Sequence, residues 1–107
     1  MDKKEFESVV GEVFGKCMKI MEEKGEIYAS EDDRFENFNV LAKDQDIYPE
    51  EALRGMLAKH TTAVNKYISK LAINSENTPK KLWEASIFDC INYYLLLYGM
   101  LRSEGDV

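Results

Sequence analysis

Asp89 is the residue whose surroundings in the sequence point most directly to chemistry. It lies in the segment from Ile87 to Tyr94, where the neighbouring residue types predict burial. A buried ionised carboxylate is costly unless it is paired with a cation or binds a metal. Asn92 lies one helical turn further along and shares a face with Asp89. Two interpretations follow: a hydrogen-bonded group that fixes helix packing, with Lys59 or His60 opposite, or part of a ligand or metal site.

Further groups that could act chemically lie between residues 59 and 70. His60 is the only histidine, and it lies on an apolar stripe beside Lys59. A histidine in such a place fits a buried structural residue as well as a ligand-binding one. Lys59 and Lys66 are about two turns apart with Lys70 beyond, so they predict either a phosphate contact or a solvated face.

Acidic side chains offer the oxygen ligands that magnesium prefers. They gather in the pair Glu22-Glu23 and in the run Glu31-Asp32-Asp33. Glu23 and Glu26 also have a Glu-x-x-Glu spacing, but Gly25 between them predicts a helix end that would separate their faces. No glycine-rich phosphate loop and no Gly-x-Ser-x-Gly pattern occurs.

Helical periodicity dominates the elements that must position these groups. Apolar residues recur every three or four positions, without any convincing strand pattern. The predicted helices are 3–24 (ended by Gly25), about 34–43, 49 to the turn at 74–77 (opened by Pro49), and about 79–101 (with Thr78 as its N-cap). We therefore predict a single all-α domain over residues 1–107, a small antiparallel bundle of three long helices and one short helix.

Two features of these helices predict close contact with another helix. The last helix is apolar on most of its circumference after Ile87, and Tyr93 to Tyr98 cannot all face one small core. A homo-oligomer is therefore expected. In the first helix, Gly11 and Gly15 each cost about 1 kcal/mol relative to alanine, so we expect a close helix approach there.

Composition and charge disfavour several classes of function. The chain has 14 Lys and Arg against 20 Asp and Glu, a formal charge of −6, which argues against a nucleic-acid groove or an anionic membrane surface. The longest apolar run, Tyr93 to Leu97, is shorter than the roughly 20 residues that span a bilayer, and no secretory leader is recognisable.

Cys17 and Cys90 each lie in an apolar periodic segment, so we predict two buried thiols. A disulfide between packed helices is the alternative. No zinc site is predicted, because the chain has neither a Cys-x-x-Cys pair nor a Cys/His cluster. A cytoplasmic protein is expected.

Three segments together carry a family resemblance. They are Lys24-Gly25-Glu26-Ile27-Tyr28 continued to Phe38, Leu57-Ala58-Lys59-His60, and Asp89-Cys90-Ile91-Asn92-Tyr93-Tyr94 continued to Leu97. In order and spacing they resemble a small all-helical phage and prophage family, the nucleotide-modification-associated domain. That family is itself similar to the MazG-like all-α NTP pyrophosphohydrolases. The resemblance covers most of the chain from Lys24 to Leu101.

The resemblance implies an all-α domain of nucleotide metabolism or DNA modification, in the host cytoplasm if phage-encoded. The matched polar positions are Lys24, Tyr28, Asn37, Lys59, His60, Asp89 and Asn92. The family's first motif is Lys-x-x-Asp-Tyr, whereas Ile27 here replaces the aspartate and can neither bind a cation nor accept a proton. Glu26 is the adjacent carboxylate that would substitute for it. Ser86-x-x-Asp89 stands where MazG-like enzymes have Glu-x-x-Asp.

Two functional hypotheses follow. In the first, the protein binds a nucleotide and, with Mg²⁺ or Mn²⁺, hydrolyses a nucleoside triphosphate by attack of water on phosphorus. Asp89 is then the catalytic carboxylate and, with Glu26, the metal ligand. The substrate-binding residues are Lys24 and Lys59 for phosphate, with Tyr28, Asn37, His60 and Asn92.

In the second hypothesis the protein is a non-enzymatic helical interaction protein that binds a host or phage protein. The two hypotheses differ in a feature that the tertiary structure decides. If Asp89, Asn92, Lys59 and Asn37 converge on an open pocket and the carboxylate there is perturbed, a ligand site is favoured. If they bond to one another in a closed group, a scaffold is favoured.

Overall fold

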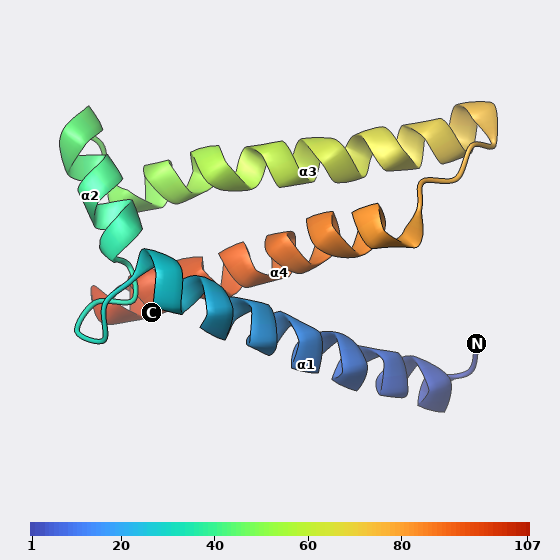
Figure 1. Ribbon diagram of the computed structural model, residues 1–107, viewed down its shortest axis with the longest axis horizontal. Helices are drawn as coiled ribbons and strands as arrows, with labels where there is room; N and C mark the ends of the chain where they lie inside the picture. The colour runs from blue at the N-terminus through green and yellow to red at the C-terminus, as the bar shows by residue number, and fades with distance from the viewer.

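The computed structural model describes residues 1–107 as four α-helices without a strand (Figure 1). They are α1 (Lys3–Tyr28), α2 (Glu36–Gln45), α3 (Pro49–Asn74) and α4 (Lys80–Ser103). The all-α prediction of three long helices and one short helix is thereby confirmed. Figure 1 shows α3 and α4 running in opposite directions, whereas α1 runs in the same direction as α4. The bundle is therefore not antiparallel throughout.

Local sequence explains where two of the long helices begin. The Asp2 side chain accepts the amide of Glu5, and the Glu5 side chain accepts the amide of Asp2, which closes a capping box at the start of α1. Pro49 opens α3, and Glu50 and Glu51 occupy its first turn, as predicted. Carboxylates there interact favourably with the positive end of the helix dipole.

The prediction that Gly25 ends the first helix is wrong. α1 continues to Tyr28, and the amide of Ala29 still donates to the Gly25 carbonyl. The glycine serves packing instead: a Cβ at Gly25 would lie 3.2 Å from Nε of Arg34, which returns from the following loop. Glu23 and Glu26 therefore stand one turn apart on a continuous helix, and both are exposed.

Three other local predictions also need correction. Thr78 is buried rather than an N-cap, and Pro79 occupies the cap position of α4 without a side-chain hydrogen bond. The short helix begins at Glu36, because the Asp33 carboxylate accepts the amide of Phe35 and holds the chain in a turn. Nothing within the chain approaches Gly11 or Gly15, where a close helix was expected.

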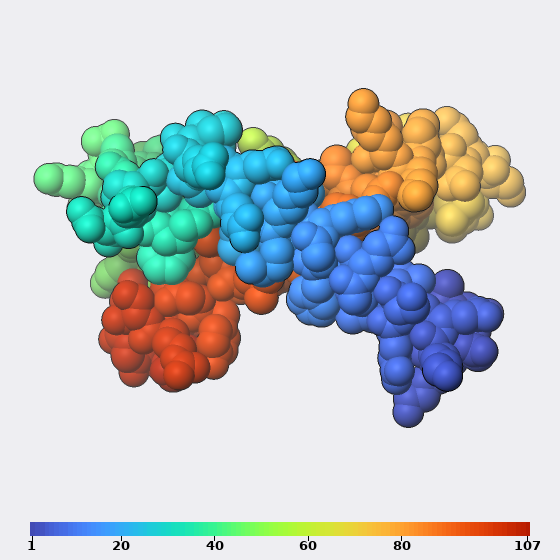
Figure 2. Space-filling view, turned by 60° about the horizontal axis from the view of Figure 1, so that its bottom comes forward, coloured from blue at the N-terminus to red at the C-terminus, as the bar shows by residue number.

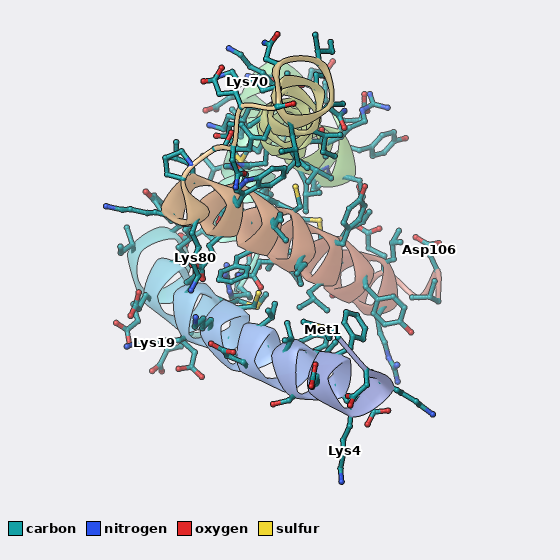
Figure 3. All side chains as sticks on the ribbon, turned by 90° about the vertical axis from the view of Figure 1, so that its right-hand side faces the viewer. Met1, Lys4, Lys19, Lys70, Lys80 and Asp106 are labelled. Carbon is teal, nitrogen blue, oxygen red and sulfur yellow. The ribbon has the colours of Figure 1, made fainter.

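The hydrophobic core lies at the end of the molecule where α2 crosses α3 and α4. Phe38, Leu53 and Met100 are buried together there. The partly buried residues packed around them are Phe35, Met56, Tyr93, Leu96 and Leu97. Seen from the opposite end, α4 lies between α1 and α3 (Figure 3). α4 is therefore the central helix.

The two cysteines do not form a disulfide. Both cysteines are free, so the disulfide alternative is not realised; Cys17 is buried and Cys90 half-buried. Charged side chains such as Lys4 and Lys19 point away from the bundle (Figure 3). None of the four helices has the length and apolar character needed to cross a membrane.

Candidate functional site

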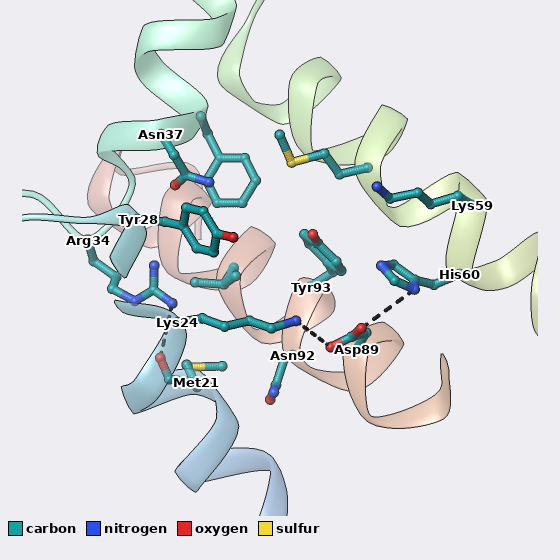
Figure 4. A pocket seen from close by; sticks show the side chains of 13 residues that line it. Met21, Lys24, Tyr28, Arg34, Asn37, Lys59, His60, Asp89, Asn92 and Tyr93 are labelled. Atoms are coloured by element: carbon teal, nitrogen blue, oxygen red, sulfur yellow. Dashed lines mark hydrogen bonds and ion pairs between the residues drawn. The ribbon is translucent and has the colours of Figure 1, made fainter. Parts of the chain in front are cut away.

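One pocket collects the side chains that the sequence singled out. It has a volume of about 490 Å³ and lies between the end of α1, the following loop, α2, α3 and α4 (Figure 4). The residues that line it are Met21, Lys24, Tyr28, Arg34, Asn37, Phe38, Met56, Lys59, His60, Asp89, Asn92, Tyr93 and Leu96. All seven matched polar positions are among them. Glu26 is not. Asp89, Asn92, Lys59 and Asn37 thus line one open pocket and do not form a closed polar group.

Helical spacing explains how residues far apart in sequence face one cavity. Each long helix contributes positions three or four apart, which lie on one face. The sets are Met21, Lys24 and Tyr28 on α1, Met56, Lys59 and His60 on α3, and Asp89, Asn92, Tyr93 and Leu96 on α4. Arg34 comes from the loop, and Asn37 and Phe38 come from α2. The pocket wall therefore uses every helix.

Asp89 is held by two basic side chains, the ammonium group of Lys24 and the imidazole of His60, from two other helices. Its Oδ1 accepts a hydrogen bond from Lys24 Nζ at 2.8 Å, and its Oδ2 lies 3.6 Å from His60 Nδ1 (Figure 4). The Asp89 side chain is 17 % exposed, so this pairing offsets a partial loss of hydration. His60 was predicted as one of two partners, whereas the sequence did not suggest Lys24 from α1.

His60 is electrically neutral near pH 7. Burial lowers its pKa below the ordinary value of 6.5, and Lys24 and Lys59 lower it further, while Asp89 acts in the opposite direction. The imidazole stacks on the Tyr93 ring, with centroids 5.5 Å apart and planes inclined at 27°. Burial raises the pKa of Tyr93, so its phenol stays protonated. The two rings form an uncharged wall beside the ion pair.

The charge balance of the pocket is opposite to that of the whole chain. Lys24, Arg34 and Lys59 carry positive charge, and Asp89 is the single carboxylate among the lining residues. With His60 neutral, two positive charges are left without a partner in a protein of formal charge −6. Arg34 donates to the Met21 carbonyl at 3.4 Å, and burial lowers its pKa without removing its charge.

Two asparagine amides in the wall are only partly satisfied. Asn92 donates to the Cys17 carbonyl at 3.0 Å, which ties α4 to α1, but its Oδ1 has no partner. The Oδ1 of Asn37 is likewise buried and unpaired. An unsatisfied buried acceptor costs about 1–3 kcal/mol.

The acidic groups predicted as magnesium ligands do not gather in the pocket. Glu26 is exposed outside it, and Asp33 instead accepts hydrogen bonds from Phe35 N and Asn39 Nδ2 beside the start of α2. No group of three or more His, Cys, Asp or Glu side chains converges in the chain. Asp89 alone remains, so the residues present do not form a carboxylate cage for a resident divalent ion. The prediction of Mg²⁺ or Mn²⁺ stays a prediction.

Sequence reasoning did not assign Arg34 and Tyr93 to the site. Arg34 follows three acidic residues, and its position between that run and Phe35 was the available signal. The sequence places Tyr93 in the apolar run of the last helix and in one of the three resemblance segments, but does not mark it as a site residue. In the structure its ring packs against both the core and His60. A residue with two such roles cannot be assigned from helical periodicity alone.

Comparison with known proteins finds no match among protein-family models, curated protein sequences or solved structures. The resemblance to the nucleotide-modification-associated family and to MazG-like enzymes therefore stays a prediction from the residues quoted above.

Proposed function

We propose that the pocket binds a nucleotide, with its phosphates against Lys24, Arg34 and Lys59. The observation that carries this proposal is the excess of positive charge in one concave site of an acidic chain. A chain of net charge −6 repels anions over most of its surface, so an anion is attracted only where cations outnumber carboxylates. Guanidinium and ammonium groups are the common protein partners of phosphate oxygens.

The rest of the pocket suits the remainder of a nucleotide. A volume of about 490 Å³ is in the range of small-molecule sites. Tyr28 and the stacked pair of His60 and Tyr93 offer aromatic surfaces, and stacking of a base on such a ring contributes about 1–3 kcal/mol. Asn37 also lines the pocket, and its side-chain amide can hydrogen-bond the polar edge of a base. Inorganic phosphate alone would use none of these groups.

Hydrolysis of a nucleoside triphosphate extends this proposal. Asp89 is the pocket's carboxylate, and it would accept the proton of a water molecule that attacks phosphorus. Lys24 occupies one of its oxygens in the structure. Phosphates that bind Lys24 compete with Asp89 for the ammonium group, which would free that oxygen for water. Mg²⁺ in such sites is commonly bound by one or two carboxylates together with substrate phosphates, and Asp89 would be its protein ligand.

A thermal-shift panel of nucleoside mono-, di- and triphosphates, with and without Mg²⁺ or Mn²⁺, tests binding. A ligand at 100 times its dissociation constant stabilises the folded state by about 2.7 kcal/mol, which raises the Tm of a domain this size by several degrees. We expect such a shift for at least one class of nucleotide. A panel without any shift would overturn the proposal and favour the interaction-protein hypothesis.

Two lysines of α3 provide a matched pair of variants. Lys59 and Lys66 are both exposed and lie on the same helix, but only Lys59 lines the pocket. A hydrogen bond to a charged group is worth about 1.5–3 kcal/mol, so Lys59→Gln should weaken nucleotide binding by about tenfold or more in titration calorimetry. Lys66→Gln should leave the affinity unchanged. Equal losses in both variants would indicate nonspecific charge attraction.

The hydrolytic extension needs its own readout. Chromatography of a bound nucleoside triphosphate after incubation should detect a monophosphate and pyrophosphate, and Asp89→Asn should abolish their formation. If calorimetry shows that Asp89→Asn still binds and the products persist, Asp89 is not the catalytic carboxylate. The phage or prophage setting implied by the resemblance is part of the proposal and is independent of this measurement.

A further inference from the structure

The outer side of α4 presents an apolar stripe that no other helix covers. Its positions are four, three, one and three residues apart, which places them along one helical face. They are Ile87 (38 % exposed), Ile91 (half-buried), Tyr94 (57 % exposed), Leu95 (42 % exposed) and Tyr98 (54 % exposed). The stripe faces neither the core nor the pocket. A solvent-exposed stripe of this kind marks an interaction surface.

The amino-terminal half of α1 has unpaired apolar residues as well. α1 and α4 contact each other near Lys16 and Cys17, where Lys16 Nζ lies 3.4 Å from Glu84 and Asn92 reaches the Cys17 carbonyl. Toward the N-terminus α1 diverges from the bundle, and Phe6 and Val9 are 58 % and 37 % exposed. In Figure 2 this amino-terminal half of α1, called the arm of α1 below, and the carboxyl-terminal half of α4 flank a hollow on one side of the molecule.

The accessible surface is larger than that of a compact monomer. A folded chain of 12.4 kDa typically exposes about 6,100 Å², whereas this one exposes 7862 Å². Its radius of gyration is 16.0 Å, against about 13 Å for a compact domain of this length. The excess of about 1,700 Å² per chain matches an obligate dimer, in which the two chains together bury about 2,000–5,000 Å².

Charge decides which occupant fits this surface. Residues 1–20 carry four acidic and four basic side chains, and α4 carries two acidic and three basic ones. The net negative charge of the chain therefore lies on the segments outside α1's arm and α4. Two copies of an acidic chain repel each other over most orientations, but they can approach through these nearly neutral elements.

We propose that the protein is a homodimer in which a second copy packs against the outer stripe of α4 and the amino-terminal arm of α1. The interface is isologous: a two-fold axis relates the two copies, so the same surface of each copy packs against the other. Tyr94 and Tyr98 are its central aromatic residues. This interface leaves the pocket on the other side of α4, so it goes beyond the proposed nucleotide binding and is tested without a nucleotide.

Sedimentation equilibrium of the full chain tests the proposal. The expected mass is twice 12.4 kDa. Tyr94→Glu introduces a charge that occurs twice in a two-fold interface, so the dimer dissociation constant should rise at least about tenfold. Ile68→Glu on α3 is the matched control, since Ile68 is 52 % exposed outside this surface, and it should leave the constant unchanged. Circular dichroism verifies that both variants retain their helices.

A second variant tests the arm of α1. Phe6→Glu lies far from the core in a position that is 58 % exposed, so the fold is expected to survive, and the dimer should again weaken. A wild-type chain that sediments as a monomer at high micromolar concentration would overturn the proposal, as would a dimer that Tyr94→Glu leaves unchanged. If Tyr94→Glu weakens the dimer but Phe6→Glu does not, the arm of α1 is not part of the interface, and that half of the proposal is wrong.

Discussion

The two ends of this helical protein use the same kind of amphipathic helix in different ways. At the end crossed by α2, the apolar faces of α3 and α4 are covered, and Phe38, Leu53 and Met100 form the core. At the opposite end no further element crosses, and apolar residues such as Phe6 and Ile73 remain in solvent. The difference shows that an apolar stripe specifies which side a helix offers for contact. Whether that side is covered depends on the presence of another element.

This division also separates the two proposed roles of the molecule. The pocket lies at the packed end, where four helices and the loop that carries Arg34 fix the positions of its side chains. The proposed dimer surface lies on the outer side of α4 and on the diverging arm of α1. α4 is common to both, because one of its faces carries Asp89 and Tyr93 and another carries Tyr94 and Tyr98.

Truncation of a core residue at the packed end should give the largest loss of stability. Leu53 is 1 % exposed, so Leu53→Ala removes buried methyl groups and leaves a cavity, at a cost of about 2–5 kcal/mol in the free energy of unfolding. Ile73 is 80 % exposed, and Ile73→Ala should change the free energy of unfolding by less than about 0.5 kcal/mol. Urea unfolding followed by circular dichroism measures both. Similar losses would mean that the two ends are equally packed.

Two helical glycines differ in the same way, one in the packed end of the molecule and one on α1 with open space around it. A Cβ at Gly99 would lie 3.1 Å from the Phe35 ring, which packs against the core, so Gly99→Ala should destabilise the fold by about 1–3 kcal/mol. Nothing lies within 4 Å of a Cβ at Gly15 on α1. Gly15→Ala should therefore stabilise by up to about 1 kcal/mol through helix propensity. Urea unfolding should show a lower free energy of unfolding for Gly99→Ala and a higher one for Gly15→Ala. A lower value in both variants would contradict this expectation.

The pocket makes stability depend on pH through His60. Burial lowers the pKa of His60 below 6.5, so the unfolded chain takes up a proton at higher pH than the folded one. Stability is therefore fully present above pH 6.5 and is lost as the pH falls through the lower folded pKa. Urea unfolding at about pH 7.5 and about pH 5.5 should reveal this loss, and His60→Gln should remove it. An unchanged pH dependence in the variant would assign the effect to other groups.

The smallest global effect is expected at the start of α1. Asp2→Ala removes the capping box, which typically costs about 0.5–2 kcal/mol of helix stability. Because the first turns of α1 lie far from the core, the loss should appear as local fraying. Hydrogen exchange should accelerate over the first two turns of α1, while the midpoint of global unfolding stays nearly constant. A clear shift of that midpoint would show that the arm is coupled to the core.

Much of the candidate site could be predicted, because the residue pattern singles out Lys59 and Asp89 and the family resemblance adds Lys24. Lys24, Lys59 and Asp89 all line one cavity. The pairing of Lys24 with Asp89 joins residues 65 positions apart, and no local pattern contains that information. Arg34 was missed for a related reason, since its place in the pocket depends on the loop that brings its guanidinium against Gly25.

The sequence by itself determined the helices, their apolar faces and the first residue of α3, because these follow from interactions between residues a few positions apart. It also determined the net charge of the whole chain. The tertiary structure decided that α1 passes through Gly25, that Thr78 is buried, and that positive charge collects around Asp89. These features depend on which helix faces meet, and that choice is a property of the packed chain as a whole.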